Sequence, residues 1–498
     1  MNNSNMKLEK SMQQNINMLR NLFINDETVI FREFDSRQNI SLKFCAISVS
    51  GMIDTKIVDE YVIQPLMEAN YSSIKYAGNV STQNIMDILL KKVVVNINVR
   101  RTSNLEQAIG EMVYGDTIIL VDGVQELLIA GTKGWVARAI EEPLSERGIK
   151  GPREGFNESI ITSLSLIRRR IRNSELKFEF MDIGVRTKTK ICICYINGLA
   201  NDKVIQELKT RLNKIDFDGI LYSQTIEEFI SDTPLSIFKT VGTTERPDVV
   251  AGNLLEGRVA VVCDGTPFVI TLPYLFVENF QAVDDYDNNY VFASFNRLLK
   301  YLAFFISVSV PSLYVAVTTF HQELIPTPLL LSIANTRTGV PLPTVVEAFA
   351  MLTGFELLRE AGVRLPQPAG QAISIVGALV IGDAAVNARL ISAPMVVVIA
   401  LTVIASFLIP RMIAPFIIIR IILLILGGFI GIYGYLFGII GLFIYLMSIR
   451  SFGVPYTIGV GLIKPEMLKD TAVRVPWWYM KLRPRLITKD LKRKATSK

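Results

Sequence analysis

The chain has 498 residues, enough for one or two soluble domains together with a membrane domain. Half of its residues are hydrophobic, and the mean hydropathy of +0.36 is high for a soluble protein of this length. The net charge of +6 is concentrated in residues 464–498, where eleven Lys and Arg stand against three Asp and Glu. A short basic end beside apolar segments is typical of a membrane protein and disfavours nucleic-acid binding.

The sequence offers little that an enzyme could use. It contains one histidine, His321, on which any zinc site or histidine-based triad would have to rest. It contains no P-loop, no dinucleotide-binding glycine motif and no nucleophile elbow. We therefore expect a protein that is not an enzyme and that holds no cofactor or metal. The cysteines lie in apolar, strand-like runs, which favours reduced and buried thiols over a disulfide. They are Cys45, Cys192, Cys194 and Cys263.

The N-terminal segment, residues 1–37, begins with a polar, Asn-rich stretch and lacks the apolar core of a signal peptide. We therefore expect the first 297 residues to stay in the compartment where they are made.

Two stretches of the N-terminal half resemble each other. Residues 45–51 and 192–198 each form a strand pattern that ends in glycine and precedes a helical run. Further on, Asp122-Gly123 and Asp264-Gly265 each stand between two apolar runs, which is typical of a β-hairpin because glycine tolerates positive φ. The coincidence favours a duplication that gives two α/β lobes over a chance pairing of common elements.

Arg168-Arg-Arg-Ile-Arg172 is the densest basic run of this half. It predicts either a solvated helix end, where cations suit the helix dipole, or a contact with lipid or an acidic surface of a neighbouring subunit.

Apolar runs long enough to cross a bilayer begin after residue 297. The predicted spans are residues 298–320, 372–388, 390–409 and 416–447. The last run has 32 residues, or ~48 Å at about 1.5 Å per residue, which exceeds the ~30 Å hydrocarbon core. It forms either one long, tilted helix or a hairpin of two short helices.

Glycines recur in this run at intervals of four and three residues, which places them on one face of a single helix. Small residues allow another helix to approach closely, and the alternative is that they line a pore. A hairpin would break the stripe, so the single helix is favoured. The stripe consists of Gly427, Gly431, Gly434, Gly438 and Gly441.

The predicted helix 344–362 has nearly the length of a span but carries charges that a lipid-facing helix would not tolerate. We expect it to be re-entrant or interfacial. Glu356 can pair with Arg359 three residues later, whereas Glu347, and Asp383 in the next span, have no local partner. Glu347, Glu356 and Asp383 are therefore candidates for an ion pathway.

The sequence predicts a two-lobed α/β soluble N-terminal region followed by an all-α polytopic transmembrane domain. Four spans give an even number of crossings, so both termini are expected on the cytoplasmic side, where basic residues accumulate. The predicted division is an N-terminal segment (1–37), lobe 1 (38–150), a linker (151–156), lobe 2 (157–275), a connector (276–297), the transmembrane domain (298–450) and a basic cytoplasmic tail (451–498).

Many short motifs are shared with one known family. They are Gly151-Pro-Arg-Glu-Gly-Phe156, Arg168-Arg-Arg-Ile171, Glu245-Arg-Pro-Asp248, Leu255-Glu-Gly-Arg-Val259, Asp264-Gly-Thr-Pro-Phe268, Thr319-Phe-His-Gln-Glu-Leu-Ile-Pro-Thr-Pro328, Arg337-Thr-Gly-Val-Pro-Leu-Pro343, Leu358-Arg-Glu-Ala-Gly-Val-Arg-Leu-Pro366, Ser374-Ile-Val-Gly-Ala-Leu-Val-Ile-Gly382 and Ser392-Ala-Pro-Met395. Through these motifs the chain resembles the A subunits of GerA-type spore germination receptors from about residue 30 to residue 460.

The resemblance implies a nutrient-responsive subunit in the spore inner membrane, surrounded by lipid and working with a transporter-like B subunit and a lipoprotein C subunit. It also implies a homo-oligomer, a pentamer, that forms a channel for monovalent cations. The N-terminal half would then face the spore core. At the position of Asp383 the family often carries Gln or another polar residue.

Two other functions remain open. The chain could be a sporulation paralogue that amplifies the germination signal. It could also be a secondary transporter whose substrate site is formed by the re-entrant helix 344–362. The second alternative is weakened because the internal duplication is confined to the soluble half.

Overall fold

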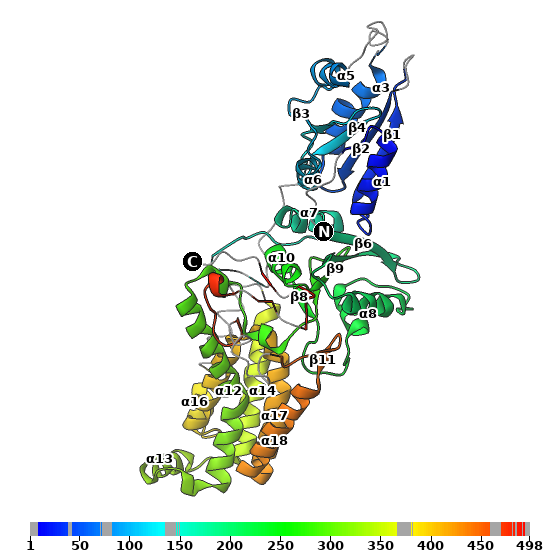
Figure 1. Ribbon diagram of the computed structural model, residues 1–498. Helices are drawn as coiled ribbons and strands as arrows, with labels where there is room; N and C mark the ends of the chain where they lie inside the picture. The colour runs from blue at the N-terminus through cyan, green and yellow to red at the C-terminus, as the bar shows by residue number, and fades with distance from the viewer. Residues whose placement is uncertain are drawn as a thin grey trace.

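The computed structural model describes residues 8–37, 42–69, 71, 82–134, 146, 148, 150–365, 380, 382–458, 470–480, 482–483, 486–490 and 492–493. Two α/β lobes follow one another, and a bundle of helices extends from the second lobe (Figure 1). The N-terminal half is thus a mixed α/β structure, as predicted.

Lobe 1 is a five-stranded antiparallel sheet with helices on both faces. The sheet has the strand order β1-β2-β4-β5-β3. Helices α1 and α6 cover one face, and α3 and α5 cover the other. Its elements are α1 (Met12–Leu22), β1 (Val29–Asp35), β2 (Lys43–Val49), α2 (Thr55–Val58), the π-helical turn η2 (Asp59–Ile63), α3 (Gln64–Glu68), α5 (Thr82–Ile88), the π-helical turn η3 (Leu89–Val93), β3 (Val99–Thr102), α6 (Leu105–Val113), β4 (Thr117–Val121) and β5 (Leu127–Ala130).

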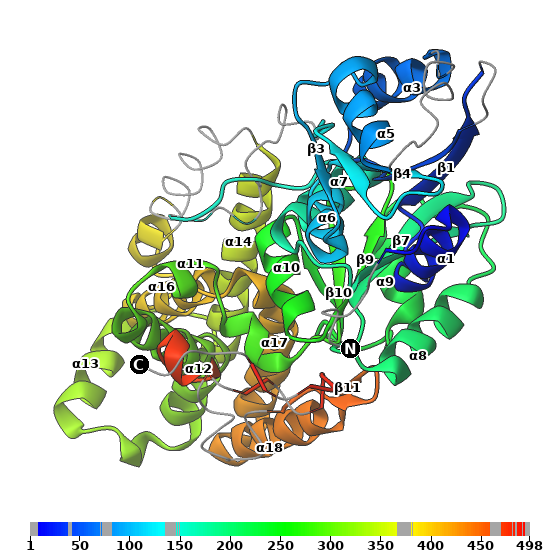
Figure 2. The ribbon, with the colours of Figure 1, turned by 45° about the horizontal axis from the view of Figure 1, so that its top comes forward.

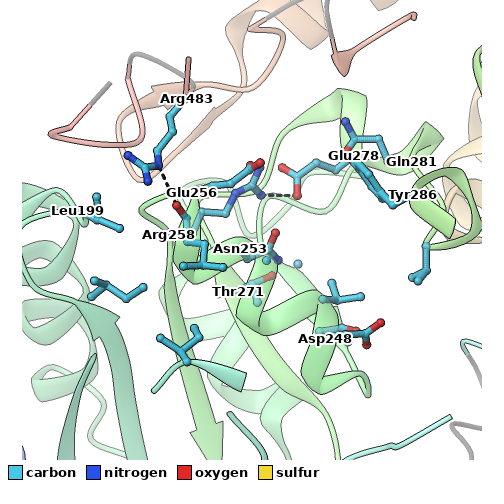
Figure 3. Close-up of a pocket in the computed structure, with 18 of the residues that line it drawn as sticks. Leu199, Asp248, Asn253, Glu256, Arg258, Thr271, Glu278, Gln281, Tyr286 and Arg483 are labelled. Atoms are coloured by element: carbon cyan, nitrogen blue, oxygen red, sulfur yellow. Dashed lines mark hydrogen bonds and ion pairs between the residues drawn. The ribbon is translucent and has the colours of Figure 1, made fainter. Parts of the chain in front are cut away.

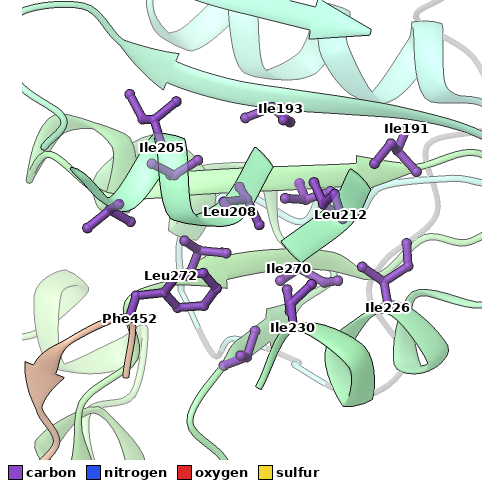
Figure 4. Close-up of a cluster of buried hydrophobic side chains, with 14 of the residues drawn as sticks. Ile191, Ile193, Ile205, Leu208, Leu212, Ile226, Ile230, Ile270, Leu272 and Phe452 are labelled. Atoms are coloured by element: carbon purple, nitrogen blue, oxygen red, sulfur yellow. The ribbon is translucent and has the colours of Figure 1, made fainter. Parts of the chain in front are cut away.

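Lobe 2 repeats this plan. Its antiparallel sheet has the order β6-β7-β9-β10-β8, which is the same sequence of neighbours as in lobe 1. Helices α7 and α10 cover one face, and α8 and α9 cover the other (Figure 4). Its elements are α7 (Ile160–Arg170), β6 (Leu176–Ile183), β7 (Thr189–Ile196), α8 (Asp202–Asn213), α9 (Ser223–Ile230), β8 (Gly242–Thr244), α10 (Pro247–Leu255), β9 (Val259–Cys263) and β10 (Val269–Leu272).

Both predicted Asp-Gly turns are present, and each also fixes the start of a helix. Asp122 Oδ1 accepts a hydrogen bond from Met12 N at 3.1 Å, at the start of α1. Asp264 Oδ1 accepts one from Ile160 N at 3.0 Å, at the start of α7. The following glycine has a φ of +83° in both lobes. The equivalence of α1 and α7 extends the repeat beyond the predicted lobes.

The predicted boundary at residue 37 is therefore wrong. Strand β1 pairs with β2 along its whole length, and α1 buries Ile16 and Leu19 completely in the core of lobe 1. The Asn-rich composition of residues 1–37 conceals apolar side chains at helical spacing, which bring α1 onto the sheet.

The four cysteines are free and buried in the sheets. Burial raises the pKa of Cys45 to about 12 and that of Cys263 to about 11, because the low-polarity surroundings disfavour the thiolate. Such thiols react slowly with alkylating reagents.

A buried ion pair joins the two lobes. Arg168 Nη2 lies 2.7 Å from Asp26 Oδ2 and 3.0 Å from Thr28 Oγ1, with both charged side chains inaccessible to solvent. The guanidinium also lies over the ring of Phe178. Both interpretations of the Arg168–Arg172 run are thus corrected for Arg168, because it binds an acidic side chain of its own chain.

The bundle begins after lobe 2 with a short connector. Its elements are the 3₁₀ turn η4 (Phe276–Phe280), α11 (Asp284–Asp287), α12 (Tyr290–Phe320), the 3₁₀ turn η5 (Gln322–Leu324), α13 (Thr327–Arg337), α14 (Thr344–Arg364), α16 (Ala393–Phe407), the 3₁₀ turn η6 (Pro410–Met412), α17 (Ile413–Ile430) and α18 (Ile432–Ser448). Among the described residues, two helices are long and apolar enough to cross a membrane, Tyr290–Phe320 and Pro410–Ile430, and two shorter ones are apolar. The predicted span 372–388 lies mostly outside the described residues.

Helix α14 packs along one face against α12, α16 and α17, and its other face is exposed. Ala348 and Met351 of α14 are buried with Val315 of α12. Further along α14, Glu356 contacts Arg420, which also binds Ser307 of α12. Residue numbers rise along one helix as they fall along the other, so α14 runs antiparallel to α12. The re-entrant or interfacial position predicted for 344–362 concerns the bilayer and stays a prediction.

The apolar run at 416–447 is a hairpin, so the favoured single helix is wrong. Helix α17 ends at Gly431, whose φ of +68° and ψ of −144° break the helix, and α18 returns along α17. A Cβ atom on Gly434 would overlap the carbonyl oxygen of Leu426, and one on Gly438 would overlap the side chain of Leu423. The five glycines therefore do not share one helix face: they are divided among α17, the turn at Gly431 and α18.

The segment after α18 is not a free tail. Residues Arg450–Ser451 (β11) and Val454–Pro455 (β12) form a small ladder, and Phe452 between them enters the core of lobe 2 beside α8 and β10 (Figure 4). Ser451 Oγ donates to Thr240 O at 2.6 Å and accepts from Tyr274 N at 3.0 Å. The predicted basic tail 451–498 is corrected, because this part of it completes lobe 2.

We expect Arg168→Met to destabilise the chain by about 3–5 kcal/mol, because it leaves the Asp26 carboxylate buried and unpaired. Thermal unfolding of the detergent-solubilised chain measures the loss. The double variant Arg168→Met with Asp26→Leu should recover most of it. Arg186→Met is the matched control, since its pair with Asp218 is exposed. Equal effects of Arg168→Met and Arg186→Met would contradict the assignment.

Gly434→Ala should destabilise the chain by about 1–3 kcal/mol, because the added methyl group forces α18 away from α17. Gly441→Ala is the control, since no atom lies within 4 Å of its Cβ position, and it should be neutral or stabilising by up to about 1 kcal/mol. The same unfolding measurement separates the two. A fully stable Gly434→Ala variant would argue against the hairpin.

Candidate functional site

Several charged side chains of the bundle are buried. An unpaired charge in apolar surroundings costs several kcal/mol, so each of them is expected to have a partner. Three elements converge on Glu347, which has no exposed surface. Its Oε2 accepts hydrogen bonds from Ser392 N at 2.9 Å and Ser392 Oγ at 2.8 Å, and Oε1 lies 3.3 Å from Arg337 Nη2. Ser392 precedes the first residue of α16, so the carboxylate also lies at the positive end of that helix.

Glu347 has no partner on its own helix, but it is paired within the chain. Its partners lie ten and forty-five residues away on other elements, where no local spacing rule could find them. The carboxylate holds the start of α14 against the end of α13 and the start of α16.

A second charged group crosses the middle of the bundle. Arg420 of α17 is almost fully buried, and its Nε donates to Ser307 O at 3.0 Å while Nη2 donates to Ser307 Oγ at 3.0 Å. The Ser307 carbonyl would normally accept from the N–H of residue 311, but residue 311 is proline and has none. Arg420 thus supplies the donor that Pro311 lacks, and α12 continues through the proline.

Glu356 balances this arginine. Its Oε1 lies 3.6 Å from Arg420 Nη1, and its Oε2 lies 2.6 Å from Arg359 Nη2. The predicted pair with Arg359 is present, and the structure adds Arg420 to it. Sequence reasoning missed Arg420 because it stands inside a long apolar run, although a charge there, together with a proline four residues after Ser307, was an available signal.

Asp383 does not join these groups. Its side chain is exposed, and its Oδ2 accepts from Asn387 Nδ2 at 3.0 Å on the next turn. The structure therefore buries Glu347 inside the bundle, leaves Glu356 partly buried beside Arg420, and leaves Asp383 exposed.

The glycines act at close contacts between helices. A Cβ on Gly427 would overlap Ser312 Oγ of α12, whose hydroxyl donates to Leu423 O at 2.5 Å. Gly431 forms the turn beside His321, and Gly434 and Gly438 lie against α17, whereas Gly441 faces open space. The packing role predicted for the stripe fits the first four of these contacts within a single chain.

A further charged cluster lies where the bundle begins, at the connector after lobe 2. Arg297 of α12 is fully buried, and its Nε lies 2.8 Å from Asp285 Oδ2 while Nη1 lies 2.9 Å from Asp470 Oδ1. Lys300 lies 3.5 Å from Asp285 Oδ1. The start of α12 is thereby tied to α11 and to the C-terminal segment.

A cavity of about 1080 Å³ opens beside this junction. Arg258 and Glu278 form a buried ion pair on its wall, and Arg483 of the C-terminal segment donates to Leu255 O at 2.9 Å across from them (Figure 3). Burial raises the pKa of Glu278, and the neighbouring guanidinium opposes that change. Both cations and carboxylates line the cavity, so its lining favours no one sign of charge.

Comparisons with known proteins agree along almost the whole chain. Residues 17–486 match the family described as Bacillus/Clostridium GerA spore germination protein. Spore germination protein KA of Bacillus subtilis (strain 168) is 44% identical over 97% of this chain and 88% of that protein. Uncharacterized membrane protein YfkQ of the same organism is 38% identical over 97% and 92%, and spore germination protein GerLA of Bacillus cereus is 36% identical over 90% of each.

Among solved structures, the chain is similar to the N-terminal domain of the A subunit of the Bacillus megaterium spore germinant receptor GerK3. That crystal structure is 33% identical, covers 54% of this chain and 98% of its own, and superposes with a TM-score of 0.42.

Arg420→Met should destabilise the chain by about 3–5 kcal/mol, because it removes a buried ion-pair partner and leaves a carbonyl unsatisfied. Pro311→Ala restores a backbone N–H for that carbonyl. The loss caused by Arg420→Met should therefore be about 1 kcal/mol smaller in the Pro311→Ala background. Thermal unfolding of the four detergent-solubilised proteins gives the coupling. Pro343→Ala, at the start of α14, is the control and should show no coupling to Arg420. Equal coupling for both prolines would remove the proposed role of Arg420.

Proposed function

The chain belongs to the GerA family of spore germination proteins, and we propose that it is the A subunit of a nutrient-responsive germinant receptor in the spore inner membrane. The observation that carries this proposal is the match along 97% of the chain to a spore germination protein that is itself covered over 88% of its length. A similarity of this extent includes both lobes and the bundle, so it concerns the whole architecture.

We propose that several copies of the chain form the conducting unit, a pentamer, and that a transporter-like B subunit and a lipoprotein C subunit complete the receptor. The packing of a single bundle supports this. Its helices are packed directly against one another through the buried clusters around Phe416 and Met395. A continuous path for monovalent cations is therefore better placed between copies than inside one copy.

The three candidate carboxylates then take different roles. Asp383 is exposed on the bundle surface, where a path between copies would pass, and a polar ring there favours cations. Glu347 and Glu356 would affect conduction by holding the bundle in shape, because their partners are in the same chain.

The lobes are proposed to face the cytoplasm, which becomes the spore core. The first described residue, Leu8, lies in the core of lobe 1, and the last, Arg493, pairs with Glu256 of lobe 2. Nutrient that arrives from outside would then be sensed by the partner subunit or by the far end of the bundle, and the lobes would assemble subunits or transmit gating.

Liposomes loaded with K⁺ test the proposal. The purified chain, alone and with its B and C partners, should release K⁺ at a rate that rises with nutrient only when the partners are present. Flux that saturates with one transported solute and needs no oligomer would instead indicate a secondary transporter. A chain that accelerates germination in spores lacking its own B and C subunits would be an amplifying paralogue.

Asp383→Leu should lower K⁺ flux in this assay without loss of folded protein, because it removes a polar group from the proposed path. Asp383→Gln keeps polarity and should retain flux with weaker selectivity for cations. Glu347→Gln should act differently, by reducing the amount of folded protein. Glu360→Gln, in an exposed pair with Arg364, serves as the control. Unchanged flux and selectivity in both Asp383 variants would place the path elsewhere.

Single cysteines test the orientation, and the buried native thiols give little background. Ser332→Cys lies on α13 at the far end of the bundle, and Ser103→Cys lies on lobe 1, and both positions are exposed. In intact cells that express the protein, an impermeant thiol reagent should label only Ser332→Cys. Lysis should expose Ser103→Cys. Labelling of Ser103→Cys before lysis would reverse the orientation.

A further inference from the structure

A short aromatic segment near the C-terminus lies against the first turns of α12. Trp477, Trp478 and Tyr479 form a 3₁₀ turn (η8), and they are 54%, 40% and 59% exposed. The ring of Trp477 lies 5.7 Å from that of Tyr286, and Trp478 lies 6.4 Å from Tyr290. Figures 1 and 2 show this segment, in red, beside the end of α12 nearest lobe 2.

Hydrogen bonds fix the segment in this place. Ser294 Oγ donates to Arg474 O at 3.1 Å and accepts from Arg474 N at 3.1 Å. Four residues earlier, Asp470 binds Arg297. The aromatic turn therefore has a fixed height along α12, and its exposed rings do not result from a loose end.

The neighbouring face of α12 is exposed and apolar. Val291, Phe292, Phe295 and Leu298 point away from the bundle, while Arg297 and Lys300 on the opposite face are buried against Asp285. Exposed aromatic and aliphatic side chains therefore continue from the body of α12 up to the tryptophans. A polar outer face would be expected if these turns were in water.

The length of α12 places this face relative to a bilayer. Its 31 residues span about 46 Å, whereas the hydrocarbon core measures about 30 Å and the bilayer with headgroups about 40–45 Å. If Phe320 ends the helix at the far side, about ten residues at its start lie beside the headgroups on the lobe side. Trp478 contacts Tyr290 in the first turn of this part, and Trp477 contacts Tyr286 of α11 just before it.

We propose that Trp477, Trp478 and Tyr479 are a membrane anchor that inserts into the headgroup region of the leaflet on the lobe side. Tryptophan and tyrosine favour that depth because their rings are apolar and their N–H or O–H groups reach water. The anchor holds Asp470 against Arg297 and thereby fixes the junction of lobe 2 with the bundle to the lipid surface. The proposal rests on the membrane location given under the proposed function.

Tryptophan fluorescence in vesicles tests the anchor. The chain has three tryptophans, so Trp135→Phe leaves Trp477 and Trp478 as the only emitters. The full-length variant is reconstituted in vesicles whose phosphatidylcholine is brominated either near the headgroup or near the ends of the acyl chains. Bromine quenches tryptophan only at close range, so the two lipids report depth. Flotation of the vesicles shows separately that the chain is inserted.

The expected result is a larger loss of emission with bromine near the headgroup than with bromine near the chain ends. Stronger quenching by the deep bromine would overturn the anchor, as would no quenching by either lipid in chains that float, since another protein surface or water would then cover the rings. Chains that fail to float would overturn the membrane location and the anchor together.

A displaced tryptophan provides the matched control. In a chain with all three tryptophans changed to Phe, Ile97→Trp puts the emitter on lobe 1, away from the bundle, at a position that is 96% exposed. Its emission should be insensitive to both brominated lipids. If this control were quenched as strongly as Trp477 and Trp478, quenching would not report insertion into the headgroup region, and the proposal would be overturned.

Discussion

Pro311 leaves the carbonyl oxygen of Ser307 without a backbone donor in the middle of α12, and Arg420 supplies the missing hydrogen bond. The same guanidinium also pairs with Glu356, so one side chain connects α12, α14 and α17 near the middle of each helix. An arginine buried among apolar helices is tolerated only when its donors are used, which restricts how these three helices can pack.

Two other buried arginines also join separate parts of the chain. Arg168 joins lobe 1 to lobe 2, and Arg297 joins the bundle to α11 and the C-terminal segment. Each binds a carboxylate from a distant part of the sequence. Hydrophobic contact alone would allow neighbouring bodies to slide, whereas a charge that must meet one particular partner specifies a single arrangement. The three units of the chain are thus held at defined positions by a few polar contacts.

The sequence allowed the two lobes and their Asp-Gly turns to be predicted, because strand patterns and glycine chemistry are local. It allowed α14 to be placed but not its neighbours, since Glu347 finds Ser392 across forty-five residues. The glycine spacing fits one helix as well as a hairpin, and the choice depends on Gly431, whose backbone can adopt a positive φ without strain. Composition misled at both ends of the chain, where polar or basic residues surround the apolar side chains of α1 and Phe452.

Because Phe452 belongs to the core of lobe 2, that lobe can be completed only after the helices of the bundle have been synthesised. The ribosome completes the strands and helices of lobe 2 before it has made any helix of the bundle, yet one side chain of the core of this lobe comes after the last helix. A nascent chain that ends before residue 452 therefore has a lobe 2 with an unfilled place between α8 and β10. Folding of lobe 2 is completed when Phe452 fills this site, so it is coupled to insertion of the helices. A chain that has failed to insert keeps an exposed apolar site that chaperones and proteases recognise.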